Sequence, residues 1–164
     1  MTTQHRLALR IGSHAILVRK PGFLAEIAHA DIDADRCHVV PETVQVELAP
    51  DPRAVPVHPV SFIEGPDTLW HIPSAEVQVY GDTLEIKGFA RVFCAGVRVV
   101  AFRSGSALHV QIEPSDTRLE SCASSRQFEA RFTLPPERTD LLVTNGYYYP
   151  VELFDGPVRP IAAG

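Results

Sequence analysis

The stretch EVQVYGDTLEIK, from Glu76 to Lys87, decides the fold. Its apolar and polar residues alternate with a period of two, which is typical of β-strands with one buried face. Gly81-Asp82 lies at its centre, and glycine at the first central position favours a two-residue type II′ turn. The turn fixes the register of the predicted hairpin. Residues expected to face each other are Val79 and Leu84, Val77 and Ile86, and Glu76 and Lys87.

Other segments repeat this pattern. Gly12-Ser13 is predicted to join residues 7–11 to residues 14–18 in a second hairpin. A four-residue loop, Arg103 to Ser106, would close a third hairpin. In that hairpin Val97, Val99 and Ala101 would align with Ile112, Val110 and Leu108.

The C-terminal part carries two further signals. Residues 128–134 alternate between apolar and polar side chains and end at Pro135-Pro136, which predicts a half-buried strand. Asn145-Gly146 favours a type I′ turn that joins residues 141–144 to residues 147–154. Because Pro150 lacks a backbone donor, we expect the last strand to lie at a sheet edge.

Composition agrees with many short strands. The 164 residues are 45% hydrophobic and 21% charged, and include 14 prolines and 10 glycines. A chain of this size buries roughly 70% of its unfolded surface, enough for one core. We therefore expect one all-β domain over residues 1–164, an antiparallel β-sandwich of immunoglobulin-like or jelly-roll-like type. It would have little helix, with Phe23 to Ala30 as a candidate. Within it, residues 1–49 would form an N-terminal subregion, residues 50–59 a proline-rich connector and residues 60–154 the sandwich core.

Charge and cysteine content limit compartment and partners. A net charge of −5 gives no general attraction to phosphate backbones, so we expect no nucleic-acid partner. No run reaches the roughly 18 apolar residues of a membrane helix, and residues 1–10 lack the order of a secretory signal. Cys37, Cys94 and Cys122 are odd in number and widely spaced, as expected of reduced thiols. The sequence therefore predicts a cytoplasmic protein without a membrane partner.

Two family resemblances follow from the order of these segments. Trp70-His-Ile-Pro, residues 84–90, Val97-Arg-Val-Val and residues 128–136 resemble the immunoglobulin-like accessory modules of bacterial carbohydrate-active proteins. Ile72-Pro73, residues 76–88, Phe132-Thr-Leu-Pro and Asn145-Gly146 resemble the α-crystallin domain of small heat-shock proteins. The first resemblance implies a glycan-related binding role and the second a chaperone-like role. Both imply a β-sandwich.

One acidic stretch has the spacing of a calcium loop. Asp31, Asp33, Asp35 and the more distant Glu42 repeat the alternate carboxylates that surround this hard cation with oxygen. Arg36 stands where such a loop needs glycine, and the alternative interpretation is a solvated acidic turn capped by Arg36. Calcium is the one cofactor that the sequence suggests.

An aromatic group is the candidate binding surface. Trp70, Tyr147, Tyr148 and Tyr149 supply flat rings with polar tips, which protein partners and sugar rings both favour. The alternative is that these rings cover the end of the core. The histidines and cysteines form no catalytic or zinc spacing, and no residue has the strand-turn-helix context of a nucleophile.

We therefore expect a non-catalytic binding or accessory module whose partner is a carbohydrate or a protein. The alternatives are a self-associating, chaperone-like β-sandwich and a calcium-stabilised domain.

Overall fold

The computed structural model describes residues 10–33, 43–68, 71–92, 95–116, 124–146 and 151–161. In these residues all regular elements are strands, so the expected all-β class is confirmed. The same residues contain no helix with the length and apolarity needed to cross a membrane.

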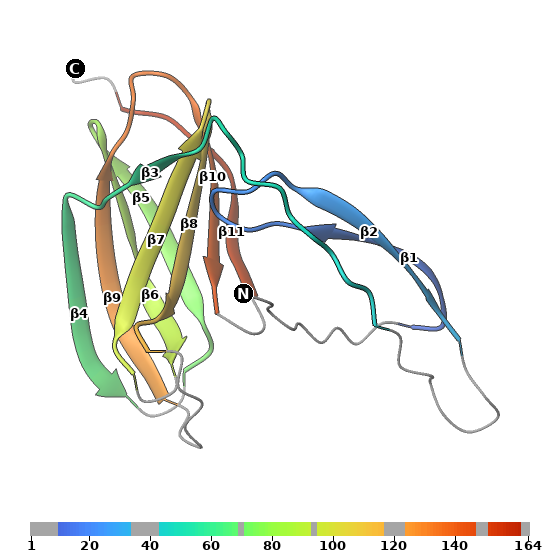
Figure 1. The fold of residues 1–164 in the computed structure, drawn as a ribbon. Coiled ribbons are helices and arrows are strands. Elements are labelled where there is room, and N and C mark those ends of the chain that lie inside the picture. Colours follow the sequence, from blue (N-terminus) through green and yellow to red (C-terminus); the bar gives the residue numbers. More distant parts are fainter. Residues whose placement is uncertain are drawn as a thin grey trace.

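The strands form three sheets (Figure 1). The four-stranded sheet has the order β4 (Ser61–Thr68), β9 (Ser124–Thr133), β6 (Thr83–Val92), β5 (Ser74–Tyr80). The five-stranded sheet has the order β11 (Val151–Val158), β10 (Thr139–Asn145), β8 (Ala107–Pro114), β7 (Val97–Ser104), β3 (Val55–Val57). The two-stranded sheet pairs β1 (Gly12–Val18) with β2 (Glu26–Ile32).

The two larger sheets bury their apolar faces in one shared cluster. The four-stranded sheet contributes Phe128 and Phe132 of β9, which are the largest fully buried side chains, together with Leu84 and Ile86 of β6. The five-stranded sheet contributes Ala101, Leu108, Val110, Ile112, Leu141 and Val143. Burying one such side chain stabilises the fold by about 1.5–3 kcal/mol. This two-layer arrangement agrees with the expected sandwich.

One strand pair departs from the expected antiparallel arrangement. β8 and β10 pair in parallel, with Leu141 beside Leu108 and Val143 beside Val110. The chain leaves β8, runs through β9 in the other sheet, and returns to the five-stranded sheet as β10. After this crossover β10 runs in the same direction as β8, so the five-stranded sheet is mixed.

The hairpin predicted over residues 76–87 is confirmed. Val79 pairs with Leu84, Val77 with Ile86 and Glu76 with Lys87. Gly81 has a φ of 58°, the left-handed conformation that the predicted turn requires.

The predicted register of the third hairpin was wrong by two residues. Val99 pairs with Ile112 and Ala101 with Val110, while Ser104 pairs with Ala107. The ladder therefore continues to a two-residue turn at Gly105 and Ser106 instead of a four-residue loop. A shift of two keeps every side chain on its predicted face.

The turn predicted at Asn145-Gly146 was also wrong, although the strands that it joins do pair. Asn145 belongs to β10 and pairs with Val151, so the connection is longer than two residues. Its amide is fully buried and donates to the Ile112 carbonyl at 3.0 Å, while its oxygen accepts from the Arg91 amide at 3.0 Å. Asn145 thus links β8 and β10 of one sheet to β6 of the other. β11 lies at the sheet edge, as expected.

The hairpin and the helix predicted for the N-terminal segment were both wrong, because the chain turns at a later position than predicted. Gly12-Ser13 is part of β1, where it pairs with Ile32 and Asp31, so it makes no turn. The predicted helix from Phe23 to Ala30 is largely strand β2. The turn lies at Lys20-Pro-Gly-Phe23, where the Phe23 amide donates to the Lys20 carbonyl at 3.1 Å. Gly22 has a φ of 79°, and proline followed by such a glycine is typical of a type II turn.

This turn packs on the outer face of the five-stranded sheet. A Cβ atom on Gly22 would lie 3.1 Å from the Phe102 ring of β7, and Arg19 pairs with Asp155 of β11 at 3.5 Å. His109 of β8 lies between these strands, opposite Phe102 and hydrogen-bonded to the Thr144 hydroxyl at 3.3 Å. Burial, and secondly the charge of Arg19, lower the pKa of His109 to about 4.

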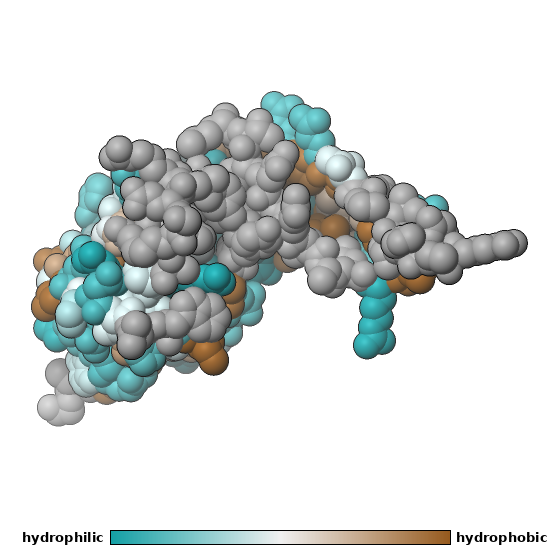
Figure 2. Space-filling model, turned by 90° about the horizontal axis from the view of Figure 1, so that it is seen from below, coloured by the Kyte–Doolittle hydropathy of each residue, from teal (hydrophilic) through white to brown (hydrophobic). Residues whose placement is uncertain are grey.

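From this docked turn the β1–β2 ribbon projects away from the two larger sheets (Figure 1). Leu17 and Ile27 face each other across the ribbon and are 49% and 57% exposed. Figure 2 shows hydrophobic side chains along this part of the molecule. The segment predicted as a connector, residues 50–59, contains the edge strand β3.

Gly88 provides a test of sheet packing. A Cβ atom there would lie 2.0 Å from the Ser74 carbonyl oxygen of β5. We expect Gly88→Ala to lower the free energy of unfolding by about 3 kcal/mol, because the backbone of β5 must move. In the same hairpin Gly81→Ala meets no atom within 4 Å and should cost only about 1 kcal/mol for its positive φ. Urea denaturation measures both values, and equal losses would contradict the close approach at Gly88.

His109 provides a test of the docked turn. Its folded pKa of about 4 lies below the value of about 6.5 expected for the unfolded chain. The unfolded state therefore binds more protons in acid, so stability is full above pH 6.5 and falls as the pH drops to 4. The loss should be at most about 3 kcal/mol, at 1.36 kcal/mol per unit. Denaturation at pH 4.5 and 7.5 measures it. The difference should shrink in His109→Gln, and an unchanged difference would refute a buried neutral imidazole.

Candidate functional site

The predicted aromatic surface falls outside the described residues. Trp70, Tyr147, Tyr148 and Tyr149 all belong to segments that the structure does not describe. Their role as a ligand or partner surface stays a prediction.

The predicted calcium site is described only in part. Asp31 lies in β2, is exposed, and accepts a hydrogen bond from the Ser13 hydroxyl of β1. Asp33 is exposed just beyond the end of β2, while Asp35 and Glu42 are not described. Over the described ranges no three His, Cys, Asp or Glu side chains are placed to hold a metal ion. Calcium binding therefore also stays a prediction.

The structure presents a different candidate, on the outer face of the four-stranded sheet. Because Leu84 and Ile86 point into the core, the residues between and beyond them in β6 point outward. The register of β6 with its two neighbouring strands determines which residues lie beside these outward-pointing side chains. Glu85 lies beside Gln78 of β5 and Arg131 of β9.

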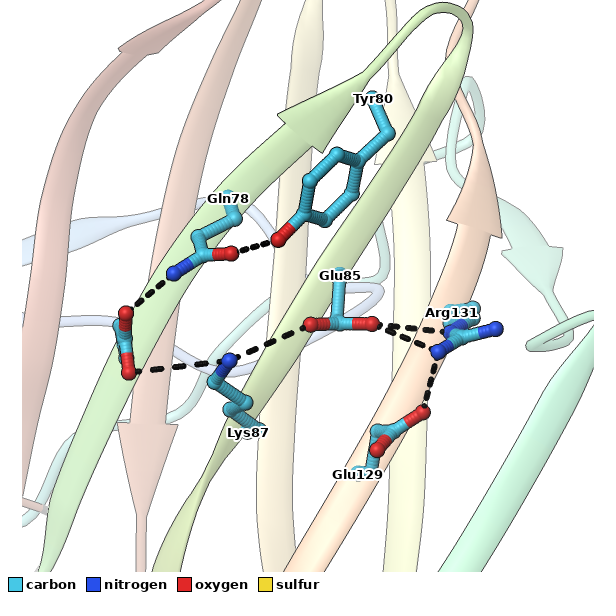
Figure 3. A network of polar contacts seen from close by, with 7 residues as sticks. Gln78, Tyr80, Glu85, Lys87, Glu129 and Arg131 are labelled. Atoms are coloured by element: carbon cyan, nitrogen blue, oxygen red, sulfur yellow. Dashed lines mark hydrogen bonds and ion pairs between the residues drawn. The ribbon is translucent and has the colours of Figure 1, made fainter.

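Seven residues on this face form one continuous polar network (Figure 3). The Tyr80 hydroxyl donates to Gln78, and the Gln78 amide donates to Glu76. The Glu76 carboxylate lies 3.9 Å from the Lys87 ammonium, which lies 3.5 Å from Glu85. Glu85 pairs with Arg131 at 2.8 Å, and Arg131 pairs with Glu129, also at 2.8 Å.

Glu85 is the centre of this network. The residue is only 6% exposed, and its two carboxylate oxygens face different cations, Lys87 on one side and Arg131 on the other. The Arg131 guanidinium also donates through Nε, at 3.0 Å, so this pair uses two nitrogens. Glu85 therefore holds both cations in fixed positions, with Arg131 at the hollow that Tyr80 also lines.

A shallow hollow of about 530 Å³ lies at this place, lined by Tyr80, Thr83, Glu85 and Arg131. The Tyr80 residue is 56% exposed beside it. The hollow thus offers one exposed ring next to planar hydrogen-bonding groups.

A second hollow of about 410 Å³ is lined by Arg53, Val55, Val57, Arg103, Gly105 and Thr133. Near it, Asp51 accepts from the Ser104 hydroxyl at 2.6 Å and from the Arg53 amide at 2.9 Å. These hydrogen bonds, that of Ser104 first, hold the pKa of Asp51 below its usual value. The Asp51 carboxylate is thus already occupied by its own neighbours.

Comparison with models of known families, with curated proteins and with solved structures finds no match for this chain. The site must therefore be interpreted from its own geometry.

Sequence reasoning found part of this site. The turn at Gly81-Asp82 correctly placed Glu76 opposite Lys87, but Tyr80 and Glu85 were not selected as site residues. Arg131 joins them only because β9 pairs with β6, and no local signal gives that pairing.

Two substitutions of the same kind test the role of Glu85. Glu85→Gln removes a buried charge that faces two cations, and should lower the free energy of unfolding by about 2 kcal/mol. Glu76→Gln is the matched control, since the Glu76 side chain is 60% exposed and its ion pair is long; it should cost less than about 0.5 kcal/mol. Urea midpoints measure both. A loss for Glu85→Gln no larger than the control would mean that the network does not fix this face.

Proposed function

We propose that the chain is a non-catalytic binding module and that the hollow beside Tyr80 takes up a neutral carbohydrate. The observation that carries this proposal is the joint placement of an exposed tyrosine ring with Glu85 and Arg131 around one hollow.

The chemistry of a sugar suits these groups. A pyranose ring has an apolar face of C–H groups, which packs on a flat aromatic ring, and a rim of hydroxyls that both donate and accept. Around Tyr80, the Thr83 hydroxyl can accept and donate, and the Arg131 guanidinium donates. A binding site of few polar groups in fixed positions is the usual arrangement for small ligands.

The network also reduces the cost of binding. Gln78 orients the Tyr80 hydroxyl, and two cations hold Glu85. A ligand would therefore immobilise fewer side chains when it binds, and so retains more of its contact energy.

Charge favours a neutral ligand at this face. The network contains three carboxylates, Glu76, Glu85 and Glu129, and two cations, Lys87 and Arg131, which pair with one another. An anionic sugar would meet a face with one excess negative charge, and a cationic ligand would compete with Lys87 and Arg131. The resemblance of residues 70–154 to accessory modules of carbohydrate-active proteins supports the same class of ligand.

The test is an NMR titration of the ¹⁵N-labelled full chain with neutral oligosaccharides, namely β-1,4-glucan, β-1,4-mannan and β-1,4-xylan hexamers. We expect one of them to shift the amide signals around Tyr80, Glu85 and Arg131. Tyr80→Ala should weaken binding at least tenfold through the lost ring contact, since stripping one aromatic anchor costs upward of about 1.4 kcal/mol.

Ile63→Ala is the matched control, because Ile63 is also exposed, at 57%, on β4 of the same sheet. It should leave the affinity unchanged. Absence of shifts with all three hexamers, or equal losses in the two variants, would refute the proposal. In the first case, large assemblies in light scattering would favour the chaperone-like alternative.

A further inference from the structure

The second hollow contains an arginine at an unusual place. Arg103 continues the inward-facing row Val97, Val99 and Ala101 of β7, and it pairs with Val55 of the edge strand β3. Alternation along the strand thus turns a cation toward the open end of the core, where an apolar residue would be expected.

Within the described part of the chain, Arg103 has no carboxylate as an ion-pair partner, unlike several other arginines. Its Nε atom is buried and has no hydrogen-bond partner among the described residues. Arg98 and Arg131 each pair with a glutamate there. Arg126, whose Nε atom is also buried without a hydrogen-bond partner, still pairs with Glu64 through a terminal nitrogen. The nearby Asp51 is already engaged with Ser104 and Arg53.

A guanidinium nitrogen that is buried without a hydrogen-bond partner is costly, because it loses hydration and gains no hydrogen bond in return. An anion in the hollow would remove this cost. The planar fork of arginine suits a carboxylate or phosphate group, which it can bind through two parallel hydrogen bonds.

The remaining lining defines the ligand further. Arg53 adds a second guanidinium at the rim, 75% exposed, and Thr133 adds a hydroxyl donor. Val55 and Val57 form an apolar wall on the same side as β3. We propose that this hollow binds a small organic anion, with its carboxylate or phosphate group on Arg103 and its apolar part along Val55 and Val57.

This proposal does not rest on the carbohydrate hollow, although the two hollows adjoin where Thr83 of the first pairs with Thr133 of the second. The two share no lining residue. An anion would meet two arginines in the second hollow, while the first is lined by one carboxylate, Glu85, and one cation, Arg131.

The experiment measures the thermal midpoint of the full chain at constant ionic strength with hexanoate, acetate, inorganic phosphate or neutral hexanamide. A ligand that binds only the native state raises this midpoint. We expect hexanoate to raise it more than acetate, and hexanamide to leave it unchanged. A shift with phosphate alone would identify the headgroup as phosphate, and a shift with hexanoate alone as carboxylate.

Arg103→Met should abolish these shifts, whereas Arg138→Met should keep them, since Arg138 is exposed and pairs with Asp140. Without any anion, Arg103→Met should melt at or above the wild-type temperature, because it removes a buried Nε atom that has no hydrogen-bond partner among the described residues. An arginine with a structural role would instead lower the melting temperature when replaced.

The proposal is overturned if no anion shifts the wild-type midpoint at millimolar concentration, or if Arg103→Met keeps the full shift. Amide shifts of Gly105 and Thr133 on adding hexanoate or phosphate to the wild-type chain locate the site independently of any variant. Shifts confined to other residues would also overturn it.

Discussion

The burial of two apolar sheet faces against each other is the constraint on which this structure depends. β9 is central to it. Its Phe128 and Phe132 side chains fill the space between the sheets, while its backbone pairs with β4 on one side and with β6 on the other. Asn145 adds a polar link across the same layers, through Arg91 on one side and Ile112 on the other. Its amide satisfies buried backbone groups that would otherwise destabilise the core.

The same alternation that fills the core also determines what faces the surface. Each inward residue of β6 and β9 forces its neighbour outward, so Glu85, Lys87 and Arg131 must share one face. Their charges compensate only because the register brings opposite signs together. At Arg103 the same alternation turns a cation inward. β7 contains no acidic residue that could pair with it.

Sequence reasoning succeeded where structure is local. The register of residues 76–87 follows from a two-residue turn, and the strand over residues 128–133 follows from its own alternation. It failed where residues far apart in the sequence determine the local structure. The Asn145 amide could have supported a turn, but Ile112 and Arg91 bind it more than thirty residues away. Gly12-Ser13 looks like a turn in isolation, yet Pro21-Gly22 makes the turn and β2 pairs with both residues.

The candidate site shows the same division. Sequence reasoning selected clustered tyrosines and clustered aspartates, whereas Tyr80, Glu85 and Arg131 lie up to 51 positions apart and meet only because β6 pairs with both β5 and β9. Burial has a different effect at Glu85 and at Arg103. Glu85 is buried with both of its oxygens paired, so its charge orders the surface around it. Arg103 has a buried Nε atom without a hydrogen-bond partner among the described residues, which is why we propose an anion there. A charge satisfied within the chain can position a binding surface, while one that is not satisfied is itself a binding site.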